Sequence, residues 1–276
     1  MAFSYRRRYC GPVEAVIFDM AGTVMDFGSI APAGVFIEVF ARSGVEISVA
    51  EARGPMGAEK RSHIRSLLND SAIGERWQRA HGRAPGDEDV DRLYAAFIPL
   101  QIDSLPRYSA LIPGAIDTSR SLRARNIRIG VNSGYSREML DVCLREAARQ
   151  GFVPDSAVAA SDVPRARPWP AMCLRNAAEL SIVDVSACVK VDDTVPGIDE
   201  GLSAGMWTIG LTASGNEVGL SLAEWQELPE IEQQARREKA TRRLGQAGAH
   251  FIVDSIADVG PVIDEIERRL SQGERP

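Results

Sequence analysis

Asp19 is the first residue of the chain whose type and position suit chemistry. It directly follows residues 13–18, a short apolar and β-branched run that predicts a buried parallel strand. A glycine-containing turn at Gly22-Thr23 comes next. Open α/β sheets bind their ligands at the carboxyl ends of their strands, so this carboxylate is a candidate nucleophile. An acidic residue often ends a strand without any function, and Asp19 alone therefore decides nothing.

Two further carboxylates, Asp192 and Asp193, close the predicted strand 187–191. Adjacent carboxylates repel each other unless a cation or a positive group lies nearby. Mg²⁺ suits such a place, because it prefers one or two carboxylates together with water and substrate phosphate. The alternative is an Asp that caps the following helix. In combination with Asp19, the pair predicts a magnesium site, and either acid can be the direct ligand.

Polar groups also follow two other predicted strands. Ser133, which ends the strand 127–132 and precedes Gly134, offers a hydroxyl and adjacent backbone N–H groups to a phosphoryl oxygen. Its alternative role is a helix cap. Arg167 lies in a proline-bounded loop, where a guanidinium can bind phosphate through two hydrogen bonds. Arg165 is equally placed by spacing, so both arginines remain candidates.

Lys60 is the candidate of a different kind, an amine in a helical stretch. If this helix begins near Met56, then Met56, Lys60 and His63 lie on one face at positions i, i+4 and i+7. A lone lysine on a helix is usually at the surface. Apolar neighbours and the charges of Arg61 and Arg65 would lower the pKa of Lys60 and favour the nucleophilic free base.

The elements that must position these residues alternate between strands and helices. Further strands are predicted at 157–160, 206–211 and 249–253, the last as an edge strand. Between residues 33 and 105 the periodicity is helical, with candidates at 34–43, 49–70 (interrupted at 54–55), 75–81 and 89–100. Helices are also expected up to about 125 and at 136–150, 170–180, 197–204, 222–245 and 256–270.

This order predicts an α/β fold, a doubly wound parallel (Rossmann-like) sheet with an inserted small helical cap domain. The core domain comprises residues 1–27 and 106–276, and the cap comprises 28–105. The net charge of −6 argues against a nucleic-acid binder. No apolar run reaches the length of a membrane span. Four cysteines without a C-x-x-C pair favour reduced thiols. We therefore expect a cytoplasmic protein with no membrane and no nucleic-acid partner.

Five stretches resemble the phosphonoacetaldehyde hydrolase (phosphonatase) family of the haloacid dehalogenase superfamily. They are residues 18–23, 51–60, 133–139, 162–168 and 205–208. The resemblance implies an aspartate nucleophile at Asp19, a Schiff-base lysine at Lys60, a small-molecule phosphonate substrate and a homodimer. It also implies Mg²⁺ bound by Asp19, the backbone carbonyl of Ala21 and the acidic pair. The residues matching Met56 and His63 would assist proton transfer at the imine.

The acidic motif departs from part of that family, because some relatives have a second Asp where this chain has Gly197. Adjacent acids are another arrangement in the superfamily, so a metal site is still expected. Which carboxylate contacts the metal stays open.

Ala21 is the most informative departure from the wider superfamily. Ester phosphatases generally have an acid two positions after the nucleophile, which protonates the leaving oxygen. Cleavage of a carbon–phosphorus bond leaves a carbanion instead, and a lysine imine on the adjacent aldehyde supplies an electron sink. The absent acid and the added Lys60 predict hydrolysis of phosphonoacetaldehyde to acetaldehyde and phosphate. The alternatives are an ester phosphatase or phosphomutase of the same superfamily, or a non-catalytic phospho-ligand binder.

Overall fold

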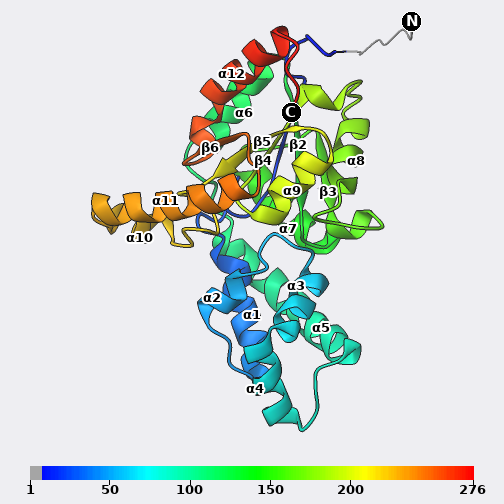
Figure 1. Cartoon of the computed structure of the whole chain (residues 1–276), viewed down its shortest axis with the longest axis vertical. Helices are drawn as coiled ribbons and strands as arrows, with labels where there is room; N and C mark the ends of the chain where they lie inside the picture. Colours follow the sequence, from blue (N-terminus) through cyan, green and yellow to red (C-terminus); the bar gives the residue numbers. More distant parts are fainter. Residues whose placement is uncertain (1–7) are drawn as a thin grey trace, which may run out of the picture.

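Six parallel strands form one sheet in the part of the chain that the computed structural model describes, residues 8–276 (Figure 1). Residues 1–7 of the predicted core domain lie outside this range. The strands are β1 (Ala15–Phe18), β2 (Arg128–Ser133), β3 (Ser156–Ala159), β4 (Cys188–Asp192), β5 (Trp207–Leu211) and β6 (Phe251–Val253). Their order in the sheet is β3-β2-β1-β4-β5-β6. The predicted fold class is confirmed, and β6 is an edge strand as expected.

Strand β1 shows why this sheet is covered on both faces. Its side chains alternate between two apolar clusters, Val16 and Phe18 in one, Ala15 and Ile17 in the other. Helices α6 (Ala115–Ala124), α7 (Arg137–Arg149) and α12 (Val259–Ser271) pack on the first face. Helices α8 (Ala171–Glu179) and α9 (Val195–Ser203) pack on the second. The sheet is therefore a buried layer, and the polar groups of the predicted site lie at its strand ends.

The helical insert between β1 and β2 consists of five helices, which lie together below the sheet in Figure 1. They are α1 (Ile30–Arg42), α2 (Val49–Arg53), α3 (Lys60–Asn69), α4 (Ser71–His81) and α5 (Asp87–Ser104). Phe36, Phe97 and Trp77 are fully buried among them. Helix α1 begins four residues before the predicted start at Gly34, because both carboxylate oxygens of Asp26 accept backbone N–H bonds from Ile30 and Ala31.

The predicted helix start at Met56 is wrong. Helix α2 ends at Arg53, and α3 begins only at Lys60, with Glu59 as its N-cap. The Glu59 carboxylate accepts the N–H groups of Arg61 and Ser62, which fixes the start of α3. Met56 lies in the intervening turn, where Gly57 has a φ of +90°. Met56, Lys60 and His63 therefore do not share one helical face.

The predicted helix 222–245 is two helices, α10 (Leu222–Glu227) and α11 (Glu230–Gln246). The break follows from Pro229, because the residue before a proline is driven out of the helical region, and Leu228 is extended at φ −69° and ψ 139°. Among the described residues, none of the helices has both the length and the apolar character needed to cross a membrane.

Candidate active site

The ends of three parallel strands bring the predicted polar residues to one place. Asp19 follows β1, Ser133 ends β2, and Asp192 ends β4. Because β1 lies between β2 and β4 in the sheet, these three ends are neighbours. Single carboxylate oxygens of Asp19, Asp192 and Asp193 all lie within 4.8 Å of one another, and all three residues are buried. The predicted cluster of acids is thus assembled by the sheet topology.

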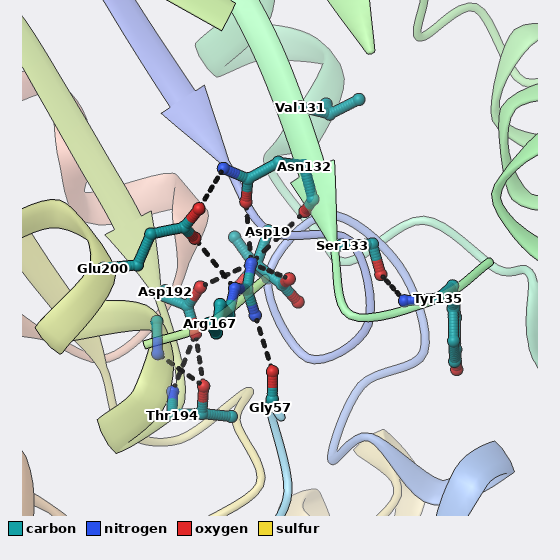
Figure 2. Close-up of polar contacts among 12 residues, drawn as sticks. Asp19, Gly57, Val131, Asn132, Ser133, Tyr135, Arg167, Asp192, Thr194 and Glu200 are labelled. Atoms are coloured by element: carbon teal, nitrogen blue, oxygen red, sulfur yellow. Dashed lines mark hydrogen bonds and ion pairs between the residues drawn. The ribbon is translucent and has the colours of Figure 1, made fainter. Parts of the chain in front are cut away.

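Arg167 lies at the centre of this cluster (Figure 2). Its Nη2 is 2.6 Å from Asp19 Oδ1, 2.7 Å from Asn132 Oδ1 and 3.1 Å from Asp192 Oδ2. Its Nε donates to Glu200 Oε2 at 2.9 Å. Although burial alone would lower it, the pKa of Arg167 is raised well above its usual value by Asp192, Asp19 and Glu200. This guanidinium is permanently charged.

Arg165, the alternative from sequence, lies elsewhere. It is exposed, and its guanidinium carbon stacks 4.8 Å from the ring centre of Trp169. Sequence spacing could not separate the two arginines, and the structure places Arg167 in the cluster.

The two adjacent acids differ in their partners. Asp192 Oδ1 accepts bonds from the backbone N–H and hydroxyl of Thr194, and Oδ2 is within 3.1 Å of Arg167 and 3.0 Å of Lys190. Its carboxylate also fills the space above Gly197, where a Cβ would lie 1.9 Å from it. Its Oδ1 is thus held by two protein donors, and its Oδ2 faces two cations.

Asp193 has fewer partners. Its Oδ1 accepts the Thr23 hydroxyl at 3.2 Å, and its Oδ2 accepts the Asn216 backbone N–H at 2.7 Å. Burial and the charges of Asp192 and Asp19 raise the pKa of Asp193 well above its usual value. By contrast, Arg167 and Lys190 outweigh burial and lower the pKa of Asp192. Asp193 is thus the carboxylate with free lone pairs, and a nearby positive charge would stabilise its ionised form.

The charges of the cluster support a cation site. Four buried carboxylates, Asp19, Asp192, Asp193 and Glu200, face two buried cations, Arg167 and Lys190. An excess of two negative charges remains when Lys60 is neutral. Burial also raises the pKa of Asp19, against the effect of Arg167. A divalent cation would balance this excess, and carboxylate oxygens are the donors that hard cations prefer.

Lys60 faces the acidic cluster from the insert. Its Nζ lies 4.0 Å from Met56 Sδ, 5.0 Å from the ring centre of Tyr135 and 5.7 Å from that of Phe36. Burial in this apolar surrounding lowers the pKa of Lys60 from 10.5 to about 8, with Arg167 as the cation that adds to the effect. Apolar neighbours were predicted to lower the pKa of Lys60, and burial is indeed the largest cause, whereas the predicted cations Arg61 and Arg65 are not among the causes. Arg61 and Arg65 point away and pair with Asp91 and Asp87.

Met56 and His63 take different places around this amine. Met56 reaches Lys60 from the turn instead of from a shared helical face. His63 stacks on Phe36 at 3.9 Å between ring centres, and its Nε2 lies 2.9 Å from the Ala52 carbonyl oxygen. Burial and the Lys60 charge lower the pKa of His63 well below its usual value. The ring is therefore neutral, donates from Nε2 and keeps an unprotonated, unpartnered Nδ1.

Asp19 and Lys60 line the same small chamber of about 20 Å³. Its lining also includes five of the other predicted site residues, Ala21, Met56, Ser133, Gly134 and Arg167, whereas His63, Asp192 and Asp193 lie behind the wall. About 10–15 Å³ is needed to hold one water molecule. The chamber therefore has room for roughly one water molecule while the insert lies in this position.

Two glycines explain how the insert closes this chamber. A Cβ on Gly57 would lie 2.2 Å from the Thr194 hydroxyl oxygen, and one on Gly134 would lie 2.6 Å from the Ala58 carbonyl oxygen. The turn at 57–58 therefore sits directly on the strand ends. The hydroxyl of Ser133 accepts the Tyr135 backbone N–H at 3.3 Å, and the N-cap of the next helix is Ser136, so Ser133 is not a helix cap.

Several residues of the cluster were not predicted. Lys190, Asn132 and Glu200 are fully buried and connect Arg167 to the sheet, with Lys190 Nζ 2.7 Å from Asn132 Oδ1. One signal was available for Lys190, because a charged residue interrupts an otherwise apolar strand. Glu200 lies inside an ordinary helix, and its sequence context does not reveal its partner.

Comparison with known proteins agrees with the fold. Residues 13–205 match the family model of the haloacid dehalogenase-like hydrolases. Phosphonoacetaldehyde hydrolase of Hahella chejuensis is 50% identical over 276 residues, with 100% of this chain and 94% of that protein covered. The enzyme of the same name from Bordetella pertussis is 50% identical, with 96% of each chain covered.

A solved structure supports the same assignment. The phosphonoacetaldehyde hydrolase-like protein from Oleispira antarctica superposes with a TM-score of 0.98 at 47% identity and covers 100% of both chains. The chain thus belongs to the phosphonoacetaldehyde hydrolase family.

Proposed function

We propose that this chain hydrolyses the carbon–phosphorus bond of phosphonoacetaldehyde to acetaldehyde and phosphate. One observation carries the proposal. A buried lysine of lowered pKa and a strand-end aspartate, Lys60 and Asp19, line the same closed chamber. Ala21, at the position where an ester phosphatase needs its acid, lines that chamber too. A nucleophilic amine is useful for an aldehyde and serves no purpose in ester hydrolysis.

The first step belongs to Lys60. Its neutral Nζ attacks the aldehyde carbon, a carbon–nitrogen bond forms, and the carbonyl oxygen leaves as water after proton transfers. The resulting protonated imine is the electron sink. Met56, whose sulfur lies 4.0 Å from Nζ, and His63, with its unprotonated Nδ1, are the residues we assign to proton transfer around the imine. Because His63 lies behind the chamber wall, its part is indirect.

The second step belongs to Asp19. Its carboxylate attacks phosphorus, the carbon–phosphorus bond breaks, and the electron pair of that bond flows into the imine to give an enamine. Arg167 and the Ser133–Gly134 segment line the chamber and would hold the phosphoryl oxygens. Water then hydrolyses the aspartyl phosphate to release phosphate. Protonation of the enamine carbon and hydrolysis of the imine release acetaldehyde and restore the amine.

We assign Mg²⁺ to the acidic cluster, held by Asp19, Asp193 and the backbone carbonyl of Ala21. The spare lone pairs of Asp193 support this choice, and the short distances from Asp192 Oδ2 to Arg167 and Lys190 make Asp192 the partner of those two cations instead. When bound, the ion would neutralise charge on the phosphoryl group and on Asp19.

We further propose that residues 28–105 move as a cap over the core domain of residues 1–27 and 106–276. The chamber size supports this motion, since a substrate of several heavy atoms exceeds about 20 Å³. We also propose a homodimer. Trp169 and Leu174, which are 53% and 42% exposed, offer apolar surface for it. A cytoplasmic location stays a prediction, consistent with four free thiols.

The test is phosphate release from phosphonoacetaldehyde, with a simple phosphate ester as the competing substrate. We expect phosphate only from the phosphonate, and we expect borohydride added during turnover to inactivate the enzyme and leave an ethyl adduct on Lys60. Faster hydrolysis of the ester, or an adduct on a different lysine, would exclude this proposal. The Lys60→Arg variant is the matched control, because arginine keeps the charge and forms no imine.

A further inference from the structure

Arg53, at the end of α2, makes a contact that the chemistry above does not use. Its Nη1 donates to the Gly28 carbonyl oxygen at 2.9 Å and to Asn216 Oδ1 at 3.0 Å. Asn216 returns a longer contact of 3.5 Å from Nδ2 to the Arg53 carbonyl oxygen. Gly28 belongs to the segment that leads from β1 into the insert, and Asn216 to the loop after β5. One guanidinium therefore joins the insert, its connection to the core, and a core loop.

Asn216 is also a partner of the acidic cluster. Its backbone N–H donates to Asp193 Oδ2 at 2.7 Å, the shortest of the two bonds that hold this carboxylate. The same loop approaches Asp193 at Gly215, where a Cβ would lie 2.5 Å from the Asp193 Cβ. A continuous path of direct contacts thus runs from Arg53 through Asn216 to Asp193.

The chain is shaped to admit this contact. Gly219 has a φ of +66°, and a Cβ there would lie 2.8 Å from the guanidinium carbon of Arg53. Gly28 has a φ of +85° and lies so close to the loop that a Cβ would meet the Leu220 carbonyl oxygen at 2.0 Å. Arg53 is half-buried, and Asn216 is 5% exposed. The Arg53 guanidinium is thus enclosed by two glycines. An exposed surface ion pair, by contrast, contributes little to stability by itself.

A second arginine, which belongs to the core, also contacts the insert close to Arg53. Arg243 on α11 pairs with Glu217 at 3.2 Å and donates to the Gly54 carbonyl oxygen at 3.4 Å. It therefore links the turn after α2 to the residue that follows Asn216. The contacts of Arg53 with Asn216 and of Arg243 with Gly54 exist only while the insert lies against the core.

We propose that Arg53 is a positioning residue that couples closure of the insert to the geometry of Asp193. When the insert closes, the Arg53 guanidinium fixes the Asn216 side chain, and the Asn216 backbone N–H in turn orients the Asp193 carboxylate. Closure of the insert and correct orientation of the Asp193 carboxylate then occur together. The metal site is therefore complete only when water is excluded from the chamber. The part of this inference that concerns metal binding rests on the proposed function, and the contact itself does not.

The first experiment measures backbone hydrogen exchange, which requires neither substrate nor metal. We expect Arg53→Met to speed exchange in the segment 212–220 about tenfold, a coupling within the usual range between linked sites. The matched control is Arg76→Met, because Arg76 pairs with Glu51 inside the insert. That variant should leave exchange in 212–220 unchanged. Equal exchange in the wild type and Arg53→Met would overturn the inference.

The second experiment measures Mg²⁺ binding by calorimetry in a double-mutant cycle. Asn216→Ala removes the side chain that Arg53 contacts and keeps the backbone N–H that Asp193 accepts. We expect each single variant to weaken Mg²⁺ binding about tenfold and the double variant to be no weaker than either. Independent, multiplying effects would refute the path through Asn216. If Arg53→Met does not fold, Asn216→Ala alone must reproduce both the faster exchange and the weaker binding.

The outcomes separate this inference from the proposed function. A wild-type protein that binds Mg²⁺ but releases no phosphate from phosphonoacetaldehyde would reject the proposed reaction alone. A wild-type protein without Mg²⁺ affinity would reject the metal assignment, and the exchange experiment would still decide the role of Arg53.

Discussion

Met56→Glu is the substitution that most directly tests the role of the lowered Lys60 pKa. The native thioether sulfur lies 4.0 Å from Lys60 Nζ, and both residues line the closed chamber. A glutamate has nearly the same length and places a negative charge at about this distance. The charge favours the ammonium form of Lys60 and raises its pKa. Met56→Gln has the same shape without the charge and is the control.

The size of the effect follows from this distance. Two unit charges about 4 Å apart interact by about 4 kcal/mol at an effective dielectric constant of ~20, which is equivalent to about three pKa units. Competition from Asp19 for the ammonium reduces this, so we expect a rise of roughly two units above the native pKa of about 8. At pH ~7 the free-amine fraction would then fall from about one in ten to about one in a thousand.

The assay is kcat/KM for phosphonoacetaldehyde over a range from about pH 6 to pH 10.5. We expect the Gln variant to rise with an apparent pKa near 8 and the Glu variant near 10, with a difference of about a hundredfold at neutral pH that closes in alkali. Ionisation of the phosphonate and hydration of the aldehyde affect both variants equally. If the acid limbs of the two variants coincide, free Lys60 amine does not limit the reaction.

Three further predictions follow from the closed site. Lys60→Met should abolish turnover yet raise the free energy of unfolding at pH ~7 by about 2–3 kcal/mol, because the folded state disfavours the charged amine. This gain should vanish as the pH rises from about 8 to 10.5, where wild-type Lys60 loses its proton in both states, and urea titrations at the two pH values check it. Asp193→Asn should weaken Mg²⁺ binding at least about tenfold by calorimetry, and excess chelator should stop phosphate release from the native enzyme; full activity in chelator would contradict the metal assignment. Gly134→Ala, whose Cβ would lie 2.6 Å from the Ala58 carbonyl oxygen, should lower kcat about tenfold while the melting temperature stays within a few degrees; an unchanged kcat would mean that the turn yields easily.

The sequence predicted the sheet well because its strands have a recognisable residue pattern. Strands β1 and β4 are short, largely apolar runs with two β-branched residues each, and Asp19 and Asp192 mark their ends. Since parallel strands end at one edge, chain order was enough to group the acids. The proximity of Lys60 and Met56 was also anticipated, although the assumed helical face was wrong, because a turn can deliver a side chain to the same point.

Other parts of the site could not be read from the chain. Two arginines two residues apart in a proline-bounded loop look alike, and only the fold buries Arg167 and exposes Arg165. The partner of Glu200 lies 33 residues away in that loop. Likewise, the contact between Arg53 and Asn216 joins segments separated by 163 positions. Pairings of this kind arise from tertiary packing, which local sequence patterns do not encode.

The contact between Asp192 and Gly197 constrains how this sequence can diverge. The carboxylate of one occupies the space that any side chain at the other would need, with 1.9 Å to a Cβ. A larger residue at position 197 therefore requires the Asp192 carboxylate to move or to be replaced, and either change would disturb its contacts with Arg167 and Lys190. Substitutions at positions 192 and 197 are therefore expected to occur together.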